Sequence, residues 1–203
     1  MLDRSLVHDV LQAARRRGGS FAEVFVEEIT NTVIRLDDGK VEELTTGLDR
    51  GAGVRVTHGT SYGYAYSNRL DRDALLKAAE AASAALRDGE GGDVVDLRTL
   101  EGPDTNRVER PAASVPAADK VAWLRELDDV ARSFSPEVIQ VVGVYADSLQ
   151  RRLIAGSDGR WVEEARPRIR LATTCATRRI RGRASSTQRP SEAAINRRCS
   201  ESP

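Results

Sequence analysis

Residues 21–44 read FAEVFVEEITNTVIRLDDGKVEEL, and this stretch decides the fold class. The part before Asp37 is rich in β-branched and aromatic side chains, which favour extended strands. The part after Lys40 continues in the same way as VEELTTGL. Between them Asp38 precedes Gly39, and glycine readily adopts the positive φ angles of a tight hairpin turn. The stretch therefore predicts a pair of antiparallel strands.

The strand pattern continues beyond this hairpin. GVRVTHG covers residues 53–59 and TSYGYAYSN covers residues 60–68, with a short polar turn at His58 to Thr60. Both segments have the β-branched or aromatic content and the alternation of half-buried strands. We therefore expect a meander of four antiparallel strands between Phe21 and Asn68.

In the last of these strands, Tyr62, Tyr64 and Tyr66 alternate with Gly63 and Ala65. Successive side chains of a strand point to opposite faces, so the three rings share one face and the other face is nearly bare. A bare face lets another element pack very closely. The rings have two interpretations: a sheet surface that is open to solvent or covered by a helix, or the aromatic wall of a groove that holds a peptide.

Three amphipathic helices are expected to cover the strands. Asp3 and Asp71 are suitable N-caps for the first two, and Pro116 is suited to start the third. The second helix has an apolar stripe at Leu75, Ala79, Ala82 and Leu86. For the third helix we expect a broad buried face, formed by Val121, Trp123, Leu124, Leu127, Val130 and Phe134.

A second strand group follows the third helix. Residues 137–145, EVIQVVGVY, are almost continuously apolar, and Ser157 to Arg160 give a second hairpin signal. The fold class is therefore α+β, with antiparallel β-meanders covered by amphipathic helices and with two lobes as one possible arrangement. We expect four regions: a helix, four-stranded meander and helix in 1–88, a connection in 89–118 that can hide short strands, a helix and second strand group in 119–177, and a disordered basic tail in 178–203.

The composition excludes several function classes. Basic and acidic residues number 31 each, so the mean charge gives no general attraction to nucleic acid, although residues 171–203 are rich in arginine. No apolar run approaches the roughly 20 residues of a membrane span, and the N-terminus has charges where a secretory signal would be apolar. We therefore expect a cytoplasmic protein with neither a membrane nor a nucleic-acid partner.

The residues that could carry chemistry are scattered. The two histidines, His8 and His58, are far apart, and Cys175 and Cys199 lack CxxC spacing and a nearby histidine. Gly51-Ala52-Gly53 lacks the third glycine and the following helix of a nucleotide-binding loop. Adjacent carboxylates in strands point to opposite faces and cannot act as a pair. From the residues alone, we expect no catalytic, cofactor-binding or metal-binding site in this chain.

Four strand segments follow one another in a specific order: FAEVFVEE (21–28), IRLDDGKVEEL (34–44), DRGAGVRV (49–56) and GYAYSN (63–68). In this order they resemble the N-terminal domain of the TldD/PmbA metallopeptidase family, and more closely its TldD branch. A later stretch, LIAGSDGRWVEEARPRIRL at 153–171, is similar to a second conserved region of the family, so the resemblance covers about residues 2–176.

The resemblance implies a cytoplasmic system that cleaves unfolded or leader peptides, in which a TldD-type subunit pairs with a PmbA-type subunit. Members are also labelled modulators of DNA gyrase. The family's zinc is held by an HExxxH helix and a later cysteine, and no position here matches them. We therefore expect a non-catalytic portion of a zinc metallopeptidase, inactive alone, that serves subunit pairing or self-association and forms part of a peptide chamber, with Tyr62, Tyr64 and Tyr66 in its groove.

The text after Thr177 departs from the family pattern. Its arginine, serine and cysteine content is what an out-of-frame reading of a GC-rich gene would produce, which predicts a truncated product that ends before the zinc motif. A natural basic tail that binds nucleic acid or an acidic partner is the rival interpretation. Two alternative functions follow: a stand-alone peptide- or protein-binding module, or an inactive fragment of a frameshifted gene.

Overall fold

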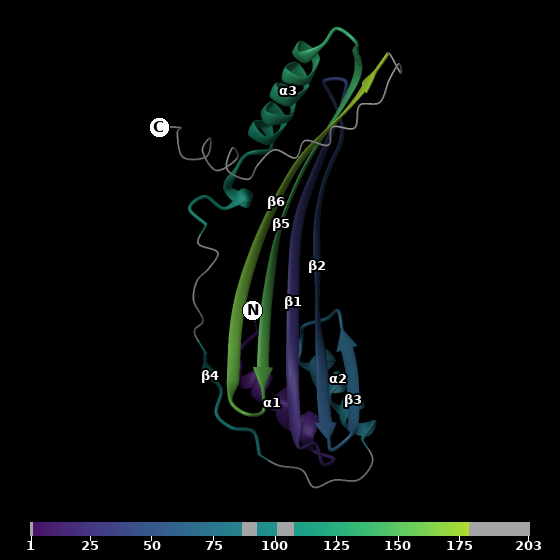
Figure 1. Cartoon of the computed structure of the whole chain (residues 1–203). Coiled ribbons are helices and arrows are strands. Elements are labelled where there is room, and N and C mark those ends of the chain that lie inside the picture. The colour runs from purple at the N-terminus through teal and green to yellow at the C-terminus, as the bar shows by residue number, and fades with distance from the viewer. Residues whose placement is uncertain (1, 87–92, 101–107, 179–203) are drawn as a thin grey trace.

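The structure, a computed structural model, describes residues 2–86, 93–100 and 108–178. A six-stranded, mostly antiparallel sheet in the order β3-β2-β1-β5-β6-β4 forms the body of the protein (Figure 1), which confirms the α+β class. In chain order the elements are α1 (Arg4–Arg15), β1 (Phe21–Asp37), β2 (Lys40–His58), β3 (Ser61–Ser67), α2 (Arg72–Ala84), β4 (Arg98–Thr99), a 3-10 turn η1 (Ala112–Ser114), α3 (Ala117–Phe134), β5 (Val138–Gly156) and β6 (Arg160–Thr177).

The expected four-stranded meander is wrong, because residues 21–68 form three strands. The two strands expected at 41–48 and 53–59 are one continuous strand, β2, which pairs with β1 from Phe21↔Thr57 to Asp37↔Lys40. Gly51 and Gly53 interrupt the pattern of β-branched residues, but neither has a positive φ. Glycine permits a turn without requiring one, and the long partner strand keeps the chain extended.

The hairpin turn at Asp38-Gly39 is confirmed, with φ angles of 47° and 75°. Gly159 has a φ of 89° in the turn between β5 and β6, which confirms the second hairpin signal. Both turns join strands of about equal length, so each hairpin pairs along almost its whole extent.

The two strand groups are not separate lobes but parts of one sheet. β1 and β5 are antiparallel neighbours from Glu23↔Gly156 to Asp37↔Val142. The short strand β4 belongs to residues 89–118, the region expected to be a connection, and pairs in parallel with β6. The region boundaries at 88, 118 and 177 stay a prediction, and residues 179–203 of the expected tail lie outside the described residues.

At one end of the sheet, α1 and α2 pack on a single face and enclose the larger core. Asp3 and Asp71 cap them as predicted. The expected stripe of α2, from Leu75 to Leu86, is buried. The bare side of β3 faces α2 so closely that a Cβ on Gly63 would collide with the carbonyl oxygen of Ala82, as the alternation with the tyrosines predicts.

At the other end, α3 covers a much smaller core made of Ile34, Leu36, Leu124 and Tyr145. The expected burial of α3 is wrong for half of its apolar face: Trp123, Val130 and Phe134 are 37%, 59% and 92% exposed. The helix instead packs through Lys120, Leu124 and Asp128, which recur every four residues. The sheet offers few apolar side chains here, so only a narrow stripe of the helix can be buried.

Candidate functional site

The candidate site lies on the face of the sheet opposite the helices. Alternate residues of β1, including Ala22, Val24 and Val26, are buried under the helices, so the residues between them point the other way. In the described part of the chain no helix packs on that second face, which we call the open face. Its β1 side chains at the α1–α2 end are Phe21, Glu23, Phe25, Glu27 and Ile29.

The tyrosines predicted from the sequence lie on this open face. Tyr62, Tyr64 and Tyr66 are 70%, 58% and 77% exposed. Through β2 the register places Tyr66 in one row with Gly53 and Phe25, and Tyr64 in one row with Arg55 and Glu23. Tyr66 and Phe25 therefore flank Gly53 in one row, whereas the row of Tyr64 contains the ion pair Arg55–Glu23.

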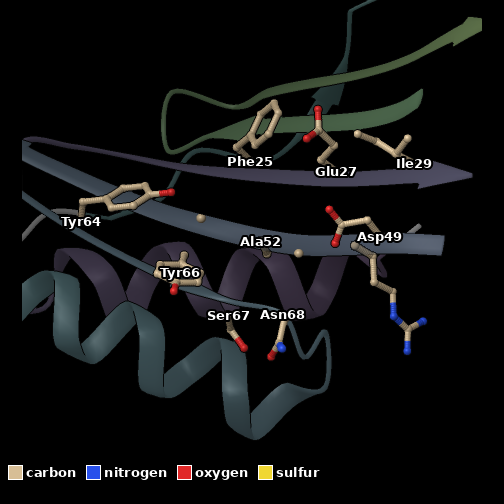
Figure 2. A pocket seen from close by; sticks show the side chains of 12 residues that line it. Phe25, Glu27, Ile29, Asp49, Ala52, Tyr64, Tyr66, Ser67 and Asn68 are labelled. Atoms are coloured by element: carbon tan, nitrogen blue, oxygen red, sulfur yellow. The ribbon is translucent and has the colours of Figure 1, made fainter. Parts of the chain in front are cut away.

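A shallow cavity of about 240 Å³ lies where β3 ends (Figure 2). We call it the Tyr64–Tyr66 groove. Tyr62 does not line it. The lining residues come from three neighbouring strands and the turn after β3: Phe25, Glu27, Ile29, Asp49, Arg50, Gly51, Ala52, Gly53, Tyr64, Tyr66, Ser67 and Asn68.

Glycines keep the floor of this groove low. On β2, Gly51 and Gly53 belong to the open face because they pair with Glu27 and Phe25. A Cβ on Gly53 would lie 2.7 Å from the Tyr64 hydroxyl, so the ring occupies the space that a side chain would fill. Glycine inside a strand often marks a place where a ligand or another backbone approaches closely.

The two carboxylates of the groove differ in their partners. Glu27 accepts hydrogen bonds from Gln150 Nε2 at 2.6 Å and from Arg152 Nε at 3.1 Å, so a cation already balances its charge. Within the described residues, no hydrogen bond or ion pair joins the Asp49 carboxylate to another residue. Asp49 pairs with Ile29 across the β1–β2 ladder and its carboxylate points into the groove (Figure 2).

Next to the groove, the outer edge of β2 has no strand beside it in the described part of the chain. β3 pairs with β2 only from Ala52 to His58. Residues 40–50 are all exposed, including Leu44 and Leu48. Such an edge presents unpaired N–H and C=O groups, which form a template for another extended chain.

The sequence predicted a groove with Tyr62, Tyr64 and Tyr66, but Tyr62 does not line this one, and Phe25, Asp49 and the edge of β2 were missed. The alternation of Tyr62, Tyr64 and Tyr66 is a local signal. Phe25 and Asp49 come together only because β1 and β2 pair in one register over their whole length. Counting outward from the Asp38-Gly39 turn would give that pairing approximately, except for the bulge between Arg35 and Leu36.

The residues do not fit a metal centre. In the described ranges, no group of three His, Cys, Asp or Glu residues is placed to hold an ion. His8 lies on α1 and His58 at the end of β2, and Cys175 is exposed on β6. A structural or catalytic zinc site needs three or four such ligands together. No chemical step is therefore assigned to a metal held by these residues.

The fold is a long, mostly antiparallel sheet with a shallow groove on its open face. Two family models match the chain: PmbA/TldA metallopeptidase domain 1 at residues 22–86 and the PmbA/TldA metallopeptidase central domain at residues 110–196. The chain belongs to the TldD/PmbA metallopeptidase family. The second match runs past the point near Ala176 where the resemblance was expected to end, and so gives no support to a departure there.

Relatives with curated names agree with this family. The chain is 30% identical over 139 residues to a metalloprotease TldD homolog of Buchnera aphidicola, which covers 68% of this chain and 28% of that protein. It is 24% identical over 173 residues to a metalloprotease TldD homolog of Haemophilus influenzae, covering 81% and 34%. The chain thus spans about a third of the length of these relatives.

Solved structures share the fold. A putative modulator of DNA gyrase from Bacteroides thetaiotaomicron superposes with a TM-score of 0.68 at 20% identity, covering 86% of this chain and 41% of that one. TldE from Thermococcus kodakarensis superposes with a TM-score of 0.65 at 14% identity, covering 86% and 40%. Among the described residues, no helix is both long and apolar enough to cross a bilayer.

Proposed function

We propose that this chain is a non-catalytic portion of a TldD-type zinc metallopeptidase subunit, which holds extended peptides and contributes to subunit pairing. One observation carries the peptide-holding role: the free edge of β2 from Lys40 to Gly51 runs directly into the Tyr64–Tyr66 groove. A strand edge forms backbone hydrogen bonds that do not depend on the sequence of the peptide, and a neighbouring pocket can bind particular peptide side chains. Strand addition of this kind is a common mode of peptide recognition.

The geometry supports addition in line with β3. The last pair of the β2–β3 ladder is Ala52↔Ser67, and the chain then turns away toward α2. A peptide that pairs with β2 beyond Gly51 would continue the row that β3 begins. Each backbone hydrogen bond contributes about 0.5–1.5 kcal/mol net, so several are needed for measurable affinity.

Subunit pairing rests on the comparisons and on exposed apolar side chains. Relatives named TldD and a structural neighbour named TldE favour a partner of the PmbA type, with self-association as the other arrangement. Trp123, Val130 and Phe134 leave an apolar stripe on α3 that water contacts in the described structure. Zinc and the cleavage of unfolded or leader peptides belong, in this proposal, to the remainder of a full-length subunit.

Two alternatives are kept. A stand-alone peptide- or protein-binding module would use the same edge and groove without any protease. An inactive fragment of a frameshifted gene, truncated before the zinc motif, would bind neither peptide nor partner. The free edge beside a lined groove favours the binding roles over the inactive fragment.

Peptide binding to the purified chain tests the proposal. Fluorescence anisotropy with a labelled, unstructured decapeptide should show saturable binding. Tyr64→Ala and Tyr66→Ala should each weaken it about three- to tenfold, because each removes an aromatic wall of the groove. Tyr62→Ala is the matched control, since Tyr62 lies on the same strand and face but does not line the groove. Equal binding by all three variants would reject the groove.

Zinc content and peptide cleavage, measured with the chain alone and with a PmbA-type partner, separate the alternatives. We expect no stoichiometric zinc and no cleavage by the chain alone, and co-elution with the partner on size exclusion. Stoichiometric zinc together with cleavage by the chain alone would overturn the non-catalytic role. Peptide binding without partner binding would favour the stand-alone module.

A further inference from the structure

We infer that the Tyr64–Tyr66 groove selects extended peptides that place a lysine or arginine side chain opposite Asp49. This inference rests on the proposed peptide-holding function and adds a preference for one class of side chain. It follows from the charge of the groove, from its apolar walls and from the register that the free edge imposes.

The charge of the groove points to a cation. Asp49 has no partner among the described residues, whereas Glu27 is balanced by Arg152. Arg55 is paired with Glu23 at 3.2 Å, and Arg160 reaches the same carboxylate at 3.6 Å. Arg50 also lines the groove, but it follows Asp49 in the strand, so its side chain starts from the opposite face. The groove therefore holds one carboxylate that a ligand can pair.

The walls of the groove suit a long basic side chain better than a small cation. Ile29 lies beside Asp49 in the β1–β2 ladder, and Phe25 and Tyr66 lie farther along the groove (Figure 2). Lysine and arginine pack their aliphatic stems on such apolar surface while the charged group reaches a carboxylate. An aromatic ring nearby adds a cation–π attraction.

The register fixes which peptide residue makes this contact. On an antiparallel pair, residues directly opposite each other share a face with Cβ atoms about 4.5–5.5 Å apart. β3 ends opposite Ala52, and Asn68 lies against Gly51, where a Cβ would be 3.8 Å from the Asn68 Cα. The first open-face position left for a peptide is therefore opposite Asp49. The side chains of the peptide residues before and after this position point to the helix-covered face.

The experiment uses the full chain and three labelled decapeptides of threonine and valine that differ only at one central position. Lysine there should bind about fivefold more tightly than norleucine, and glutamate more weakly than both. The preference should shrink at 1 M salt, because a partly exposed ion pair is screened. In Asp49→Asn the lysine and norleucine peptides should bind equally, and in Asp49→Lys the order of lysine and glutamate should reverse.

N-methylation of the peptide tests the strand geometry without changing the protein. In an added strand only alternate peptide N–H groups face the protein. Two lysine peptides are compared, one N-methylated at the odd-numbered residues and the other at the even-numbered residues. The peptide whose methylated N–H groups point away from β2 should keep its affinity, and the other should lose it. Equal loss in both would overturn pairing with the edge.

The outcomes separate this inference from the function on which it rests. Equal binding of the lysine and norleucine peptides to the unmodified chain would overturn the basic preference and leave peptide holding in place. An unchanged lysine preference in a folded Asp49→Asn chain would also overturn it, because another residue would then make the contact. Absence of binding by every peptide would reject both the preference and the peptide-holding function.

Discussion

The two ends of the sheet are covered in different ways. At the α1–α2 end, two helices bury a large apolar core that includes Leu11, Val24, Leu75 and Leu153. At the α3 end, one helix contributes Leu124 to a small core with Ile34, Leu36 and Tyr145, and makes a buried ion pair, Lys120–Asp147. Long strands connect the ends, and no helix of the described residues covers the stretch of sheet between α2 and α3 (Figure 1). Helices thus pack on this sheet through mainly apolar contacts at one end and through partly polar contacts at the other.

The difference teaches how a helix with few apolar contacts is fixed in place. Lys120 Nζ lies 2.6 Å from Asp147 Oδ2, with side chains only 5% and 9% exposed, and 5.2 Å from the centre of the Tyr145 ring. An ion pair in a buried site adds specificity of position more than net stability, because desolvation offsets most of the attraction. We expect this pair to fix the register of α3 on β5, with Val130 and Phe134 left exposed.

The largest expected effect comes from breaking this pair. Asp147→Ala leaves the Lys120 ammonium buried without its partner, which should cost about 3–5 kcal/mol of unfolding free energy. Hydrogen exchange should show lost protection in α3 and the adjacent part of β5, while the amides of α1 and α2 keep theirs. Equal loss of protection at both ends would show that the sheet unfolds as one cooperative unit. The two ends would then not differ in how they are stabilised.

The double variant Lys120→Met with Asp147→Leu is the control for this prediction. It replaces both charges with apolar groups of similar size and should recover most of the stability. Failure to recover would mean that Asp147 acts through contacts other than the ion pair.

A smaller effect is expected from Gly63→Ala at the α1–α2 end. The new Cβ would meet the backbone carbonyl of Ala82, which is not free to move within α2, so α2 must shift from β3 at a cost of about 1–3 kcal/mol. Gly47→Ala on β2 is the matched control, because its Cβ would meet only the Asn31 side chain, which can rotate. Urea midpoints measure both; equal midpoints would refute tight packing of α2 on β3.

The smallest expected effect is the loss of folding stability at low pH. The backbone N–H of Ala74, helped by Arg69, holds the pKa of Asp71 below its ordinary value at the α1–α2 end. The backbone N–H of Val141, helped by Arg132, does the same for the pKa of Asp38 at the α3 end. A depressed folded pKa gives stability that is present above the unfolded value of 3.8 and is lost as pH falls through the folded pKa.

Replacing Asp71 or Asp38 by asparagine tests whether these carboxylates cause the loss of stability at low pH. Asp71→Asn keeps an N-cap acceptor, and Asp38→Asn keeps a residue that tolerates the positive φ of 47°. Urea midpoints at neutral pH and at about pH 3 should therefore differ less in each variant than in the unmodified chain. An equal or larger difference would show that the acid dependence arises elsewhere.

The sequence predicted the features that depend on near neighbours in the chain. The turn at Asp38-Gly39 needs only a residue that accepts positive φ. The caps at Asp3 and Asp71 need only a side-chain oxygen at the start of a helix. The close approach of α2 to Gly63 follows from alternation within one strand. Each of these has a physical cause within a few residues.

The errors concerned features that distant segments decide. Leu48 to Gly53 resembles a break between strands, yet β1 supplies a partner on both sides of it. The buried face of α3 was predicted from hydrophobicity, yet the face that packs on the sheet contains Lys120, which pairs with Asp147 on β5. In both cases the partner lies elsewhere in the chain, and the local pattern contains no information about it.

By itself, the sequence determined the α+β class, the hairpin turns, the helix starts and the placement of three tyrosines on one strand face, because φ preferences, capping and side-chain alternation act locally. Only the tertiary structure decided that both strand groups share one sheet, that the β2 edge next to Gly51 has no neighbouring strand among the described residues, and that Asp49 and Phe25 meet Tyr64 and Tyr66 in a groove. Those outcomes depend on strand register, which pairing between distant segments sets.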